Sequence, residues 1–116
     1  MKKLIRIIIL VVFSFSMTSC YYDQIEEVEI DPGTVIEFAA DIQPIFAQNC
    51  VECHNANRDP DLRAENAYNS LVPEYVTQGN ADNSELYSVL NGGHGNISTT
   101  DLARIEAWIN SGALNN

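Results

Sequence analysis

Residues 50–54 read Cys50-Val51-Glu52-Cys53-His54, and this stretch decides what the fold is built around. The order is C-x-x-C-H, the pattern typical of covalent attachment of a c-type haem. Two thiols one helical turn apart can each form a thioether with one haem vinyl group. The next residue, His54, is then held beneath the ring, where its imidazole can bind the iron. The sequence predicts one covalent haem on Cys50 and Cys53, with His54 as the proximal iron ligand.

A ligand for the opposite side of the iron could come from a glycine-rich segment, Gly92-Gly93-His94-Gly95-Asn96. Glycine lets a backbone approach a ligand closely and leaves a neighbouring imidazole free to orient. His94 is the only histidine besides His54, so it is the candidate distal iron ligand. The alternative is an exposed loop histidine, with the iron five-coordinate or holding water.

Two other kinds of site use closely spaced cysteines. A zinc site could combine Cys50, Cys53, His54 and His94, but structural zinc sites usually draw their second pair of ligands from neighbouring positions. A redox-active dithiol would be expected within a βαβ context, and no such pattern is present. Haem attachment is therefore preferred over both.

The first 19 residues are typical of a secretory signal and are not expected to belong to the fold. Positive residues near the start precede an apolar run, and small residues then precede Cys20. The segment resembles a bacterial lipobox, which implies cleavage before Cys20 and lipidation of its thiol. We therefore expect a lipid-anchored protein of the cell envelope, on the periplasmic or surface face. Residues 20–35 would form an acidic tether, and residues 36–116 a single domain.

The charge of the chain excludes some partners. The 116 residues carry a formal net charge of −10. Every lysine lies in the signal, which leaves three arginines against 16 carboxylates. Such a surface repels nucleic acid and would steer a basic redox partner toward the protein.

Periodic apolar residues predict an all-α domain of about four short helices around the haem. The expected helices cover residues 42–49, with Asp41 as N-cap, and 62–71, 84–90 and 99–111. Ser98 and Asp101 fit a capping box at the start of the last helix, and Gly112 fits its C-terminal end. We expect Phe46 and Trp108 to serve contacts between helices. Arg63 is either a partner for a haem propionate or a solvated side chain.

Three stretches in this order resemble the class I c-type cytochromes, the small single-haem domains of bacteria. They are Asp41–Phe46 before the C-x-x-C-H motif, Gly79–Tyr87, and Ile97-Ser98 opening a helix that ends at Trp108–Ala113. The resemblance implies that the first and last helices cross near the haem edge. It also implies a carrier of single electrons and not an enzyme, although weak peroxidase activity stays open. The alternative is a haem module that binds or senses small ligands through an open iron.

The chain departs from this family at the second axial ligand. The family usually supplies a methionine just before the last helix, but Met1 and Met17 are the only methionines and both lie in the signal. No position of this sequence can take over that role. With His94 in its place the reduction potential would be lower, because methionine ligation raises it.

Overall fold

The computed structural model describes residues 1, 3, 30, 31 and 33–116. Within these residues the structure is helical and contains no strand, so the predicted all-α class is confirmed. The elements are η2 (Phe38–Ile42), α2 (Gln43–Asn49), α3 (Ala67–Leu71), α4 (Glu85–Asn91), η3 (His94–Asn96) and α5 (Thr99–Asn110).

The first helix begins earlier than predicted. A turn of π-helix, η2, precedes α2 without a break, so the helical segment starts at Phe38 and not at Ile42. Asp41 is not the N-cap residue, but its carboxylate accepts a hydrogen bond from the Glu37 N–H at 2.9 Å and satisfies that end of the helix. Pro44, which has no N–H to donate, is the second residue of α2 and lies where the π-helical turn η2 passes into α2.

The second helix is shorter than predicted and covers only Ala67–Leu71. The preceding residues form turns around the Asp61 side chain, which accepts bonds from the Arg63 N–H at 3.2 Å and from Asn66 Nδ2 at 2.8 Å. An aspartate that bonds nearby groups in this way competes with helix formation. The prediction of a helix over residues 62–66 was therefore wrong.

The last two helices agree with the prediction to within one residue. Ser98 is the N-cap of α5, and its Oγ accepts the Asp101 N–H at 3.1 Å. At the other end Gly112 has φ +110°, and the Ala113 N–H bonds the Trp108 carbonyl at 2.9 Å. These bonds satisfy groups that a helix end leaves unpaired.

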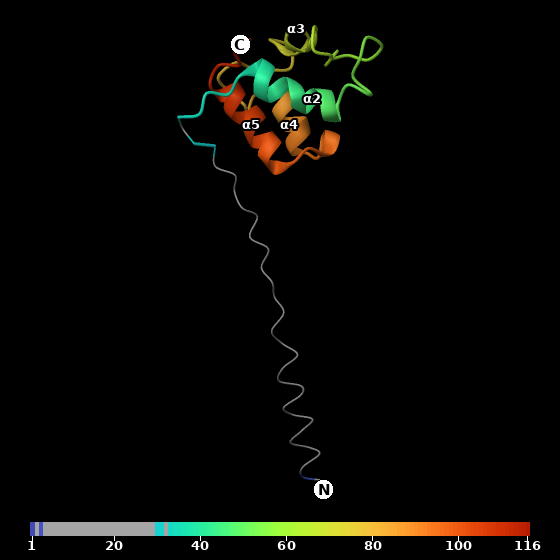
Figure 1. Cartoon of the computed structure of the whole chain (residues 1–116), viewed down its shortest axis with the longest axis vertical. Helices are drawn as coiled ribbons and strands as arrows, with labels where there is room; N and C mark the ends of the chain where they lie inside the picture. Colours follow the sequence, from blue (N-terminus) through green and yellow to red (C-terminus); the bar gives the residue numbers. More distant parts are fainter. Residues whose placement is uncertain (2, 4–29, 32) are drawn as a thin grey trace.

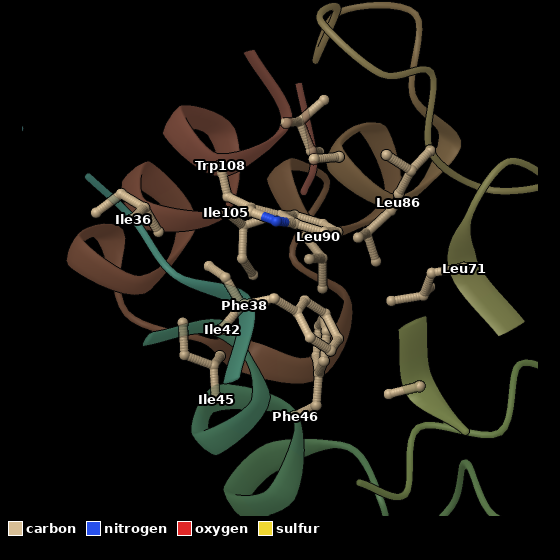
Figure 2. Close-up of a cluster of buried hydrophobic side chains, with 14 of the residues drawn as sticks. Ile36, Phe38, Ile42, Ile45, Phe46, Leu71, Leu86, Leu90, Ile105 and Trp108 are labelled. Atoms are coloured by element: carbon tan, nitrogen blue, oxygen red, sulfur yellow. The ribbon is translucent and has the colours of Figure 1, made fainter. Parts of the chain in front are cut away.

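The first and last helices are joined by a cluster of aromatic rings. η2 and α4 both pack against α5, and Figure 1 shows α2, α4 and α5 grouped together with α3 beside them. Phe38 lies 5.2 Å from Trp108 and 5.3 Å from Tyr68, measured between ring centroids. Figure 2 shows Phe38 and Trp108 within the buried cluster, toward which Leu71 reaches from α3. These ring contacts hold η2, α3 and α5 together, and the loops between the helices start from these elements.

The expected signal and lipidation site lie almost entirely outside the described residues. Cys20 is among the residues that the structure leaves out, and so is most of the acidic tether. In the part that is described, no helix has the length and apolar character needed to cross a membrane.

Candidate functional site

The C-x-x-C-H stretch forms a tight turn directly after α2. Cys50 is the C-cap residue of that helix, and its carbonyl accepts the N–H groups of Cys53 at 3.1 Å and His54 at 2.8 Å. Both thiols are free, with Cys50 half-buried and Cys53 exposed. Burial raises the pKa of the Cys50 thiol, so it stays protonated at neutral pH. Two free thiols and one imidazole therefore project from a single turn.

A backbone carbonyl orients the His54 ring. Nδ1 of His54 lies 3.2 Å from the carbonyl oxygen of Pro60. Because a carbonyl oxygen can only accept, Nδ1 is the nitrogen that donates in this bond, and Nε2 is the nitrogen left to bind a metal. Histidines that bind metals are usually held in this way through their second nitrogen. The loop that follows the motif thus prepares Nε2 of His54 as a ligand.

His94 faces His54 although 40 positions separate them in the sequence. It opens η3, between Gly93 at φ +93° and Gly95 at φ +77°. The centroids of the two imidazole rings are 6.0 Å apart, with an angle of 79° between their planes. Sequence reasoning chose His94 by elimination, and the structure brings it to the same place as His54.

This separation is the one expected for two imidazoles that share a metal. A metal–nitrogen bond is about 2 Å long, so two rings on opposite sides of one ion have centroids roughly 6 Å apart. The distance between the two rings is therefore compatible with a metal ion between them.

A pocket of about 500 Å³ adjoins both histidines. Its volume falls within the range of about 300–1,000 Å³ found for cofactor and small-molecule sites. The walls are mostly apolar and come from α2, the loop after the motif, α3, α4 and η3. The lining residues are Phe46, Asn49, Cys50, Cys53, His54, Arg58, Asp59, Pro60, Leu62, Leu71, Tyr75, Glu85, Leu86, Val89, Leu90, His94 and Gly95.

One wall residue leaves apolar surface uncovered. Val89 of α4 is 43% exposed although it lines the pocket. Its neighbours on the same helix, Leu86 and Leu90, are 7% and 6% exposed. A large apolar group in the pocket would cover this surface, which is a favourable change. The apolar walls, the two thiols and the two histidines together fit a haem.

The arginine that lines the pocket is not Arg63, for which the sequence left a haem propionate partner and a solvated side chain as alternatives. Arg63 lies outside the pocket lining and forms a two-bond pair with Asp61, at 2.9 and 2.6 Å. Arg58 lines the pocket instead, together with Asp59 and Glu85. Arg63 is therefore engaged elsewhere, and Arg58 is the arginine placed to meet a negative group of a bound cofactor.

Sequence reasoning missed the part played by the loop after the motif. The carbonyl of Pro60 holds His54, and the neighbouring Asp59 accepts a hydrogen bond from Tyr75 Oη at 3.1 Å. That bond raises the pKa of Tyr75. A backbone carbonyl has no signature in the sequence, and the only signal was the position of Pro60 six residues after the motif histidine.

Two further expectations concern aromatic residues. Trp108 is fully buried against Phe38 and takes no part in the pocket lining, as expected of a contact between helices. Phe46 also packs near Phe38, at 6.5 Å between ring centroids, but it lines the pocket as well. Phe46 therefore belongs both to the contact between helices and to the wall of the pocket.

The donors do not gather as a zinc site would require. No group of three or more His, Cys, Asp or Glu side chains in the described residues lies close enough to hold a metal ion. A structural zinc site is normally tetrahedral with four such ligands. In the described residues Cys50, Cys53, His54 and His94 are therefore not gathered as a set of zinc ligands.

Comparisons with protein-family models, with curated proteins and with solved structures found no match for this chain.

Proposed function

We propose that this protein is a monohaem c-type cytochrome that carries single electrons outside the cytoplasm. The observation that carries the proposal is the 6.0 Å separation of His54 and His94 beside two free thiols of a C-x-x-C-H turn. The helical fold and the three stretches that resemble class I c-type cytochromes agree with it.

Each residue of the site has a separate task in this proposal. Cys50 and Cys53 hold the haem as thioethers, His54 and His94 bind the iron, and Pro60 orients His54. When bound, the haem supplies an iron that accepts and releases one electron. Apolar walls such as Leu71 and Leu90 keep water away from it. The exposed position of Cys53 leaves one edge of the site open to a partner.

The cellular setting follows from the sequence. Lipidation at Cys20 would attach the protein to a membrane, and the acidic tether would separate the domain from that surface. The many carboxylates favour a basic redox partner and disfavour nucleic acid. The protein would act in the periplasm or on the cell surface.

A redox titration tests the proposed activity. We expect a single reversible one-electron step in this titration. In a separate rate measurement, electron exchange with a positively charged partner should slow as salt is added, because salt screens the attraction between exposed charges. A negatively charged partner is the control, and its exchange should become faster with salt. The absence of a reversible step would remove the carrier proposal, and a rate that ignores salt for both partners would remove the basic partner.

The open-iron alternative, a module that binds or senses small ligands, needs His94 to stay away from the iron. The facing histidines favour the carrier over that alternative. The zinc alternative would give a colourless protein with no haem absorption.

A further inference from the structure

The two histidines that face each other are held very unequally. His54 is half-buried, and its ring is fixed by the bond from Nδ1 to the Pro60 carbonyl. Its backbone is fixed on both sides, since its N–H donates to Cys50 and its carbonyl accepts from Leu62 at 3.1 Å. It also follows Cys53, a proposed attachment point, without an intervening residue. Both the ring and the backbone of His54 are therefore held by hydrogen bonds.

His94 has none of these anchors. Its side chain is exposed, and within the part of the chain that the structure describes it makes no hydrogen bond. Gly93, Gly95 and Asn96 all have positive φ values, of 93°, 77° and 48°. A backbone of this kind is easily rearranged because glycine accepts both left- and right-handed conformations at little cost. A metal-bound histidine without a partner on its second nitrogen lacks the usual support for its orientation.

We propose that a small uncharged ligand can replace the imidazole of His94, and not that of His54, on the iron. The protein would then bind such ligands in addition to carrying electrons. The inference rests on the proposed haem function. In the exchange the bond between iron and the His94 nitrogen breaks and its electron pair stays on the nitrogen. The incoming ligand donates a pair of its own, and no electron enters or leaves the iron.

The chemistry of the pocket selects the charge of the ligand. Leu86, Val89 and Leu90 are apolar residues of the same pocket wall. Glu85 belongs to α4, the helix that leads into the His94 segment, and adds a carboxylate to this wall, whereas Arg58 and Asp59 adjoin Pro60 on the His54 side. An anion would lose its hydration beside apolar and negative groups, which is unfavourable. A neutral diatomic molecule has little hydration to lose.

Rapid mixing of the reduced holoprotein with CO tests the proposal. Because His94 must leave first, the observed rate should level off at high CO. In His94→Ala the rate should instead rise in proportion to CO without a limit. The two CO-bound spectra should agree, since both proteins keep His54. Azide at the same concentration should leave the spectrum of the oxidised wild-type protein unchanged.

A loop variant separates this mechanism from a general loosening of the fold. Alanine at Gly93 would be strained at φ +93° and would disfavour the loop conformation that presents His94. We expect Gly93→Ala to raise the limiting rate about tenfold. Gly79→Ala is the matched control, because Gly79 has φ +81°, has equally open space around it and lies outside the pocket lining. Its limiting rate should equal that of the wild type.

Several results would overturn the inference. A low-spin spectrum that ignores CO would reject exchange and leave the carrier proposal intact. A CO-bound wild-type spectrum unlike that of His94→Ala would mean that His54 is displaced instead. Equal effects of Gly93→Ala and Gly79→Ala would deny the loop its role, and ready binding of azide would deny the selection by charge. A high-spin or haem-free protein before any CO is added would reject both proposals together.

Discussion

The side chain at position 94 sets which atom faces His54 across the pocket. Replacement by methionine would exchange an imidazole nitrogen for the thioether sulfur that c-type cytochromes usually offer. Thioether ligation raises the potential of haem iron, so we expect His94→Met to stay low spin and to have a higher midpoint potential, measured by spectroelectrochemistry. Asn91→Met is the control, since Asn91 ends α4 and does not line the pocket. An unchanged potential in His94→Met would contradict the ligand assignment.

The ion pair of Asp61 predicts how the stability of the fold depends on pH. Its hydrogen bonds with the Arg63 guanidinium hold the pKa of the carboxyl well below its usual range. A carboxyl with a depressed folded-state pKa stabilises the fold above its ordinary pKa of about 3.9 and loses that effect as the pH falls through the folded value. We expect Asp61→Asn to be less stable than the wild type at pH 7.

The difference in free energy of unfolding between Asp61→Asn and the wild type should narrow below about pH 4. Denaturant titrations of the two holoproteins at several pH values provide the measurement. Asp82→Asn is the control, because Asp82 is exposed and in no ion pair among the described residues. A difference for Asp61→Asn that is the same at every pH would refute the prediction.

Residue identity was enough to choose one half of the candidate site. Cys50, Cys53 and His54 were found from the spacing of the motif alone, because their chemistry depends on neighbours along the chain. His94 could be chosen only by elimination, and its distance from His54 depends on how α4 and the glycine segment fold. The Pro60 carbonyl and Arg58 were missed because loop geometry, and not residue type, brings them to the pocket.

At the scale of elements, the start of α5 depends on one hydroxyl group. Ser98 Oγ accepts the Asp101 N–H at 3.1 Å. Loss of such a cap costs about 1 kcal/mol, so Ser98→Ala should lower the free energy of unfolding by roughly that amount in a denaturant titration. Ser98→Asp keeps an acceptor and should lose much less. Equal losses in the two variants would show that the cap does not stabilise the helix.

The helices that were predicted well are those whose limits are set by nearby residues. α5 has its capping serine and its terminal glycine. α4 begins directly after Ser84, whose hydroxyl makes no cap bond but donates to the Asn80 carbonyl and accepts the Thr77 N–H in the loop just before the helix. The early start at Phe38 depends instead on distant contacts: its N–H donates to Asn116 Oδ1 at 3.0 Å, and its ring packs against Trp108. Contacts across the whole chain leave no local pattern, which is why this boundary was missed.

At the scale of the whole molecule, the pocket is a space inside the fold that the proposed haem would fill. A space of about 500 Å³ lies between α2, α3 and α4. Without a group inside it, the apolar side chain of Val89, which is 43% exposed, would lack packing partners on one side. In the proposed function, attachment through Cys50 and Cys53 keeps the haem in this space. The haem would then complete a core that the chain alone leaves open.

Removal of both attachment points should therefore destabilise the fold. We expect Cys50→Ala combined with Cys53→Ala to give little folded protein, judged by thermal unfolding followed by far-ultraviolet circular dichroism. Cys20→Ala removes the thiol expected to carry the lipid and neither of the proposed haem attachment points, so this variant is the control and should unfold like the wild type. A stable, cooperative double variant without haem would contradict the view that the cofactor completes the core.

The proposed function depends on a haem held between His54 and His94. The absorption spectrum of the reduced, purified protein tests this most directly. We predict a Soret band with the visible bands of six-coordinate low-spin iron, retained after denaturation because the haem is covalently attached. A colourless protein, or a high-spin spectrum in the absence of added ligand, would contradict it.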